Sequence, residues 1–315
     1  MRPSFIFFLL ISIFRLNAQQ LPEMKDWFLP TGEWGSSPEL YVVEFGSGQD
    51  TVVLLHGGWG GDYTGLISAV AGLEDEFHFV LYDQRGSLHS PSPDSLISFE
   101  NHIEDLELLR KALKLEKISI MGHSMGAVLA SAYATRYPEN VAALTLVTPA
   151  YLRTQFGEEE QRVYDLQSQN QQKFMNRPEV DQELEKYALN EENLSPQQNT
   201  AKFRINFARR MLFDVKNWSG FTGGRSFYQG HVYGLTESTY PKTGWDYISE
   251  FKEQAYPVSF IAASHDFLDF GNGLISKWAK DIQRSGLQII PEAGHMVWID
   301  QPVVFKNALR NALAK

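Results

Sequence analysis

The segment that most constrains the fold of this chain is the pentapeptide GHSMG at Gly122–Gly126. It follows an apolar stretch typical of a buried strand, Lys117–Met121, and leads into a helix of small residues, Met125–Tyr137. A serine between two such elements needs a very tight turn. The residues two before and two after it approach each other closely, so only glycine fits at those positions. The segment therefore predicts a strand–turn–helix unit that raises the Ser124 hydroxyl above the end of a sheet.

Short apolar strands alternate with helices on both sides of this unit. The predicted strands are Glu39–Glu44, Thr51–Leu55, Phe77–Tyr82, Lys117–Met121, Val141–Val147, Pro257–Ala262 and Leu287–Ile290. The predicted helices are Phe99–Leu113, Met125–Tyr137, Gly273–Arg284 and Pro302–Ala314. Such alternation is typical of the α/β class, in which helices flank a mostly parallel sheet.

The alternation stops between Tyr151 and Gly244. This stretch is rich in Gln, Glu and Asn, then in aromatic residues and Gly. It has helical stretches at Glu158–Phe174 and Gln197–Phe213 but no segment typical of a buried strand. Because so long a stretch cannot be a loop in a compact domain, we predict an inserted helical lid at residues 151–244. The core is then divided into residues 19–150 and 245–315.

The first residues have the pattern of a secretory signal peptide. Arg2 is followed by a continuous apolar run, Phe5–Phe14, and then by a candidate cleavage site ending at Ala18. The run is short for a membrane span, so we predict that residues 1–18 form a cleaved signal peptide. An uncleaved tether is the alternative. We expect a secreted or periplasmic protein, with no stable membrane insertion after cleavage.

Composition excludes several kinds of chemistry and partner. The 315 residues include no cysteine, which excludes disulfides, thiolate catalysis and cysteine-ligated metal. The 38 acidic residues outnumber the 28 basic ones, giving a formal net charge of −10. An acidic chain repels nucleic acid and anionic lipid, so we expect neither as a partner.

A serine hydroxyl becomes a strong nucleophile only when a base takes its proton. In the predicted arrangement, an acid and then a histidine follow the serine along the chain. Of eight histidines, His295 is the one directly after the last predicted strand, although a plain surface histidine is the alternative. Asp266 follows the strand Pro257–Ala262 and is the predicted acid, with Asp269 as second choice. We interpret His123 as a packing residue.

An acyl transfer also needs two N–H donors aimed at the developing oxyanion. Met125, the residue after the serine, supplies one. Gly58, in the loop His56–Gly60 after its strand, is the best candidate for the other, although a simple glycine turn is the alternative. This chemistry needs no metal and no cofactor.

With these residues placed, the chain resembles the α/β-hydrolase superfamily, and two motifs resemble the proline iminopeptidase (prolyl aminopeptidase) group. They are His56–Gly60 (HGGWG) and Asp83–Ser90 (DQRGSLHS). The resemblance also implies Gly58 and Met125 as oxyanion donors. Trp59 stands where that group has proline, Leu88 stands where it has glycine, and its lid glutamate motif is absent. The DQRG part of the second motif also occurs in related esterases and C–C hydrolases, and the alternative is that Asp83 and Arg85 simply brace the loops around the site.

An aminopeptidase must pair the substrate ammonium with a carboxylate. Candidates at the start of the lid are Glu158, Glu159, Glu160 and Asp165, of which Glu159 is our choice. Acids at a helix start can also be solvated groups that favour the positive end of the helix dipole. For an apolar pocket we predict Trp59, Trp218 and Phe227, although these side chains could equally pack the lid on the core.

The sequence thus predicts an exported serine hydrolase that releases N-terminal proline or small apolar residues from short peptides. A carboxylesterase or a C–C bond hydrolase on small acyl substrates is the enzymatic alternative. A non-catalytic ligand-binding protein on the same scaffold is the alternative of another class. The complete set of Ser124, Asp266 and His295 argues against the last, because a binding protein has no need of it.

Overall fold

The structure is a computed structural model that describes residues 23–33, 35, 37–223 and 228–314. The predicted signal peptide at residues 1–18 and the predicted pocket residue Phe227 therefore lie outside the described residues. Within the described part of the chain, no helix has the length and apolar character needed to cross a membrane.

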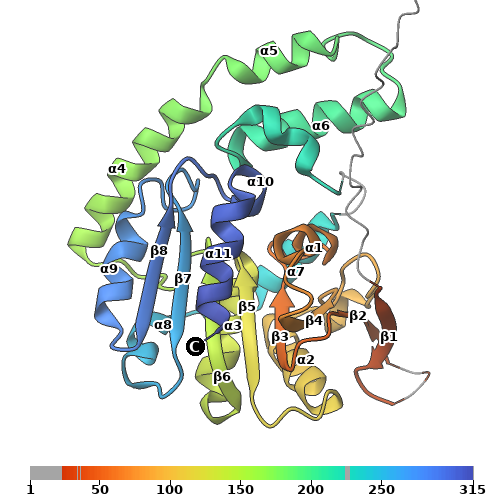
Figure 1. Cartoon of the computed structure of the whole chain (residues 1–315), viewed down its shortest axis with the longest axis vertical. Coiled ribbons are helices and arrows are strands. Elements are labelled where there is room, and N and C mark those ends of the chain that lie inside the picture. Colours follow the sequence, from red (N-terminus) through yellow and green to blue (C-terminus); the bar gives the residue numbers. More distant parts are fainter. Residues whose placement is uncertain (1–22, 34, 36, 224–227, 315) are drawn as a thin grey trace, which may run out of the picture.

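A single eight-stranded sheet forms the centre of the molecule (Figure 1), in the order β1-β2-β4-β3-β5-β6-β7-β8. The strands are β1 (Lys25–Pro30), β2 (Glu39–Phe45), β3 (Asp50–Leu55), β4 (Phe77–Tyr82), β5 (Ile118–His123), β6 (Val141–Val147), β7 (Val258–Ala263) and β8 (Ser285–Ile290). Strands β4 to β8 and β3 pair in parallel, whereas β1 and β2 are antiparallel. The predicted α/β class is confirmed.

Every predicted strand is present, but β1 was not predicted. It forms one edge of the sheet, and Leu29 is its one buried residue among exposed and half-buried neighbours. The central strands β3, β4 and β7 are almost wholly buried. A buried strand reads as a continuous apolar run, whereas an edge strand such as KDWFLP carries no such signal.

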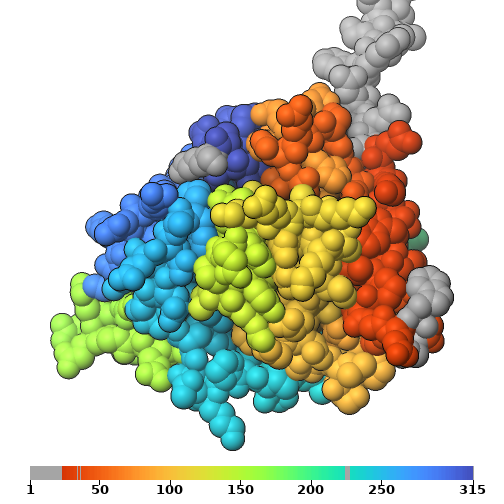
Figure 2. Space-filling view, turned by 90° about the horizontal axis from the view of Figure 1, so that it is seen from below, coloured from red at the N-terminus to blue at the C-terminus, as the bar shows by residue number. Residues whose placement is uncertain are grey.

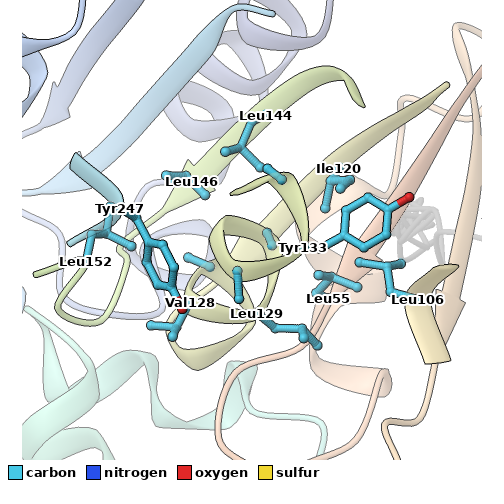
Figure 3. Packing of buried hydrophobic residues seen from close by; sticks show 14 of the residues in the cluster. Leu55, Leu106, Ile120, Val128, Leu129, Tyr133, Leu144, Leu146, Leu152 and Tyr247 are labelled. Atoms are coloured by element: carbon cyan, nitrogen blue, oxygen red, sulfur yellow. The ribbon is translucent and has the colours of Figure 1, made fainter. Parts of the chain in front are cut away.

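Helices cover both faces of the sheet. One face carries α2 (Phe99–Ala112), α3 (Met125–Arg136), α8 (Tyr247–Glu250) and α9 (Gly273–Asp281). The other carries α1 (Thr64–Val70), α10 (Val297–Asp300) and α11 (Pro302–Leu313). Figure 3 shows how the first face is packed, with Tyr133 of α3 among Leu55, Leu106 and Ile120.

The insertion has a small core of its own. It contains α4 (Glu158–Met175), α5 (Glu179–Lys186), α6 (Pro196–Met211) and the 3-10 helix η3 (Val215–Gly220). Buried residues of α5, α6 and η3, such as Leu184, Ile205 and Val215, pack together in a cluster separate from the sheet. By contrast, α7 (Gly230–Ser238) places Val232 in the main core.

The carboxyl ends of the parallel strands point toward the side where α6 lies (Figure 1). Figure 2 views the molecule from below Figure 1, that is, from the side away from α6. There the red N-terminal segments and the blue C-terminal segments flank the yellow and green middle of the chain, as the strand order requires. Residues that follow β3, β5, β6, β7 and β8 are therefore gathered at one edge of the sheet, beneath the insertion.

We expect Leu106→Ala to lower the free energy of unfolding by about 2–5 kcal/mol, because it leaves a cavity in this core. Leu106 is fully buried against Tyr133 (Figure 3). Leu166 is the matched control, since its side chain is 61% exposed, and Leu166→Ala should change stability by less than about 0.5 kcal/mol. Urea unfolding followed by tryptophan fluorescence measures both, and equal effects would contradict this account of the core.

Candidate active site

Ser124 occupies the sharp turn between β5 and α3. Its φ of 55° lies in the left-handed region, which is strained for a residue with a side chain. A Cβ at Gly122 would lie 2.5 Å from the carbonyl oxygen of Gly126. A Cβ at Gly126 would collide with the carbonyl oxygen of Leu55, at the end of β3. The turn is as tight as the sequence predicts, and both glycines are needed for it.

His295 and Asp266 meet at the carboxyl edge of the sheet. The imidazole Nδ1 of His295 lies 2.9 Å from Oδ1 of Asp266, and both side chains are buried. The same carboxylate oxygen accepts the backbone N–H of Leu268 at 3.1 Å. A carboxylate at Nδ1 favours the tautomer whose Nε2 can accept a proton. His295 and Ser124 line the same cavity.

Asp269, the second choice for the acid, has a different environment. Its carboxylate accepts the N–H groups of Leu274 at 3.0 Å and Ile275 at 2.7 Å, in the first turn of α9. Burial raises the pKa of Asp269 to about 6, and these hydrogen bonds oppose the rise. The structure thus places Asp269 on a helix start and Asp266 on the histidine.

The two predicted oxyanion donors also face the cavity. Met125 is the first residue of α3, where backbone N–H groups have no acceptor within the helix. Gly58 has a φ of 69°, and it lines the cavity from the loop after β3. A Cβ at Gly57 would lie 2.7 Å from Cβ of Ser124, so this loop passes directly beside the serine. The arrangement can present two N–H groups to one carbonyl oxygen.

The Asp83-Gln84 pair braces the loops around the site. Asp83 is fully buried and accepts the N–H groups of Tyr63 and His89, each at 2.9 Å. Gln84 donates its backbone N–H to Nε2 of His56 at 3.1 Å and its side-chain amide to the His56 carbonyl at 2.9 Å. The motif therefore fixes the start of the loop that carries Gly58, and it lies behind the cavity wall.

His123 contributes to the position of His295. Its Nε2 lies 3.2 Å from the backbone carbonyl oxygen of His295, which also accepts the Thr148 hydroxyl at 2.9 Å. Burial lowers the pKa of His123 well below its usual range, so the ring stays neutral near pH 7. The packing interpretation of His123 fits these contacts, which hold the backbone of the predicted base.

A cavity of about 540 Å³ opens above Ser124, between the sheet edge and the insertion. Its walls are mostly apolar. The apolar side chains that line it include Phe203, Phe207, Met211, Phe221, Phe267, Leu268, Met296, Trp298 and Ile299. Its charged lining residues among those described are Asp62, Arg204 and Arg210. Sequence reasoning missed the α6 residues of this set, because a helix pattern does not show which face will meet a cavity.

Two aromatic residues predicted to contact substrate lie elsewhere, which corrects the prediction. Trp59 is fully buried, donates its indole N–H to the Tyr240 hydroxyl and stacks on His102 with ring centroids 4.8 Å apart. Trp218 donates its N–H to Glu183 at 3.2 Å and packs in the core of the insertion. Neither side chain lines the cavity, because each indole N–H donates to a polar partner elsewhere in the fold, Tyr240 for Trp59 and Glu183 for Trp218.

The acids at the start of α4 also lie outside the cavity. Glu159 is exposed and pairs with Lys277 of α9 at 2.5 Å. Glu160 is buried, and its carboxylate accepts from Arg153 and from the indole N–H of Trp278, both at 2.8 Å. The choice of Glu159 as ammonium partner is therefore wrong, because these carboxylates attach the insertion to the core.

Fold and site together define the class of the protein. Residues 50–302 match the alpha/beta hydrolase fold family, and the chain belongs to that family. The chain is similar to the proline iminopeptidases of Flavobacterium johnsoniae and Elizabethkingia meningoseptica. Each is 24% identical to it, over 293 residues (89% of this chain, 94% of that protein) and 300 residues (89% and 92%) respectively.

Solved structures show the same fold. A proline iminopeptidase-related protein from Thermus thermophilus has a TM-score of 0.63 at 23% identity, covering 93% of this chain and 98% of that one. A thermophilic esterase from Thermogutta terrifontis has a TM-score of 0.65 at 18% identity, covering 92% and 98%. Peptidase-related and esterase structures are thus about equally similar to this chain.

The two acids near the site give a matched test. We expect Asp266→Asn to lower kcat roughly 10⁴-fold with little change in KM, because an amide favours the wrong tautomer of His295. Asp269→Asn should leave kcat within about fivefold and lower stability by about 1 kcal/mol through the start of α9. Hydrolysis of 4-nitrophenyl butyrate and thermal unfolding measure the two effects. A larger loss of kcat in Asp269→Asn would reverse the assignment.

Proposed function

We propose that the protein is a serine hydrolase that works through an acyl-enzyme. One observation carries the proposal: Ser124, on a strained turn, lines the same cavity as His295, whose imidazole is bonded to a buried carboxylate. A serine and a histidine that line one cavity, with a carboxylate hydrogen-bonded to the histidine Nδ1, are the groups needed for nucleophilic attack on a carbonyl.

The proposed reaction has two steps. His295 takes the proton of the Ser124 hydroxyl as its oxygen attacks the substrate carbonyl, and Asp266 stabilises the imidazolium that forms. The N–H groups of Gly58 and Met125 hold the oxyanion. His295 then gives its proton to the leaving group, which departs and leaves an acyl group on Ser124. Water, deprotonated by His295, releases the acid and restores the serine.

The cavity favours a carboxylic ester of a small, largely apolar acid as substrate. Its walls are mostly apolar, and the lid glutamates expected to hold an ammonium group pair with core residues instead. An ester has no ammonium group, so it needs no buried carboxylate in the pocket.

Release of N-terminal proline is a second candidate, and one residue favours it. Asp62 is the single carboxylate among the described residues that line the cavity, and it could pair with a substrate amine. Its Oδ1 accepts the backbone N–H of Thr64 at 2.8 Å, which fixes the side chain next to the oxyanion loop. The similar proteins that are named proline iminopeptidases support this candidate.

Export is part of the proposal and rests on the sequence of residues 1–18 alone. An apolar run after Arg2 that ends before Ala18 is typical of a cleaved signal peptide. N-terminal sequencing of the mature protein from its native host would show a start near residue 19. A chain that keeps Met1 would contradict it.

We expect a fluorophosphonate probe to label the wild-type protein and not Ser124→Ala, because the probe reacts only with an activated serine. A wild type that stays unlabelled would defeat the hydrolase proposal and favour a ligand-binding protein.

Hydrolysis of 4-nitrophenyl butyrate and of prolyl-coumarin amide then separates the two substrate classes. A higher kcat/KM on the prolyl amide would reverse our preference for the ester.

A further variant decides the role of Asp62. If the protein releases proline, Asp62→Asn should raise KM for prolyl-coumarin amide roughly tenfold or more, because a charged hydrogen bond to the amine is lost. The same substitution should leave hydrolysis of 4-nitrophenyl butyrate unchanged. Glu159→Gln is the matched control, since Glu159 pairs with Lys277 outside the cavity. An equal effect of both substitutions would exclude Asp62 as the amine partner.

A further inference from the structure

We propose that Arg210 is a specificity-determining residue that binds a carboxylate of the substrate. The preferred substrate is then an ester that carries a free carboxylate as well as the scissile bond. This inference deepens the proposed function and rests on it. It depends on where Arg210 lies, on what its neighbours do and on the charge of the cavity.

Arg210 lies close to the reacting groups. It belongs to α6 and lines the cavity above Ser124. Its guanidinium carbon is 3.8 Å from the centroid of the Phe267 ring, and that ring lies 4.7 Å from the ring of His295. A permanent positive charge is therefore one aromatic ring away from the predicted base.

The guanidinium of Arg210 has no hydrogen-bonding or ion-pair partner among the described residues, so it is available to a ligand. Within the described part of the chain it forms no ion pair and no hydrogen bond; it lies over the face of Phe267, and its charge opposes the rise that burial causes in the pKa of Tyr233. The other two arginines of α6 have partners: Arg204 donates to the carbonyl oxygens of Thr222 and Gly223, and Arg209 lies 3.8 Å from a carboxylate oxygen of Asp181. Arg210 is exposed at the cavity, and of the three arginines it is the one without such a partner among the described residues.

The acidic composition of the chain bears on the missing charge partner of Arg210. The chain has ten more acidic than basic residues, so acidic partners for an arginine are plentiful. The one described carboxylate that lines the cavity, Asp62, has no ion pair with Arg210 within 4.0 Å. The guanidinium carbon lies over the Phe267 ring, a contact that uses no N–H group, so the N–H groups are available to an acceptor such as a carboxylate.

Two matched pairs of esters test the inference. The first places the charge on the acyl group: 4-nitrophenyl hydrogen adipate against its neutral isostere, 4-nitrophenyl 5-carbamoylpentanoate. The second places it on the leaving group: the butyryl ester of 4-hydroxybenzoate against that of 4-hydroxybenzamide. We expect the wild type to prefer the acid in one pair by roughly tenfold in kcat/KM, since a charged hydrogen bond to the ligand is gained.

Three variants assign the preference to Arg210. Arg210→Gln should remove the preference, measured as the ratio of kcat/KM for the acid to kcat/KM for its neutral isostere, whereas Arg210→Lys should keep part of it. Arg209→Gln is the matched control, because it removes the same charge from the neighbouring position, where the side chain faces Asp181 rather than the cavity. It should retain the wild-type preference.

The outcomes separate this inference from the proposed function. A wild type that the fluorophosphonate labels but that shows no acid preference in either pair overturns the role of Arg210 alone. So does a preference that Arg210→Gln leaves intact, or a loss that Arg209→Gln reproduces. A wild type that is unlabelled and hydrolyses none of the four esters overturns the proposed function, and this inference with it.

Discussion

The site depends on the contact between the first turn of α3 and the end of β3. Gly126 lies so close to the carbonyl oxygens of Leu55 and His56 that no other residue fits there. Because His56 begins the loop that carries Gly58, this contact joins the serine turn to the predicted oxyanion loop in one rigid unit. Strain at Ser124 is tolerated because the surrounding backbone is fixed on both sides. In the proposed chemistry, this unit would present both oxyanion donors from a fixed backbone.

The parallel sheet explains how distant residues reach this unit. Ser124 follows β5, Thr148 follows β6, Asp266 follows β7 and His295 follows β8, so each parallel strand end adds one group at the same edge. His295 is held three times, through its imidazole by Asp266 and through its backbone carbonyl by Thr148 and His123. Its position is set by the core, which leaves the insertion free to vary in the substrate that it admits.

The sequence predicts best what local physics decides. The strand–serine–helix turn was predictable because its glycines are required by close backbone contacts, and the buried strands because they are continuous apolar runs. The direction in which each side chain points was not predictable from the sequence. Trp59 stands in a glycine-rich loop near the site, yet its N–H finds Tyr240, which follows 181 residues later. No local sequence pattern indicates such a pairing, so the loop sequence is equally compatible with Trp59 in a pocket and with Trp59 in the core.

The acids at the start of α4 show why substrate class is the hardest feature to read. Their number at a helix start suggested an ammonium site. In the structure Glu159 pairs with Lys277, and Glu160 accepts from Arg153 and Trp278, where the insertion packs against α9. The Asp83 motif, which suggested peptides, braces loops behind the cavity instead. Among the elements of the insertion, α6 contributes the aromatic rings of Phe203 and Phe207 and the side chains of Arg204 and Arg210 to the cavity wall. The core that carries Ser124 and the helix that lines the cavity can diverge separately, so likeness in the core says little about the substrate.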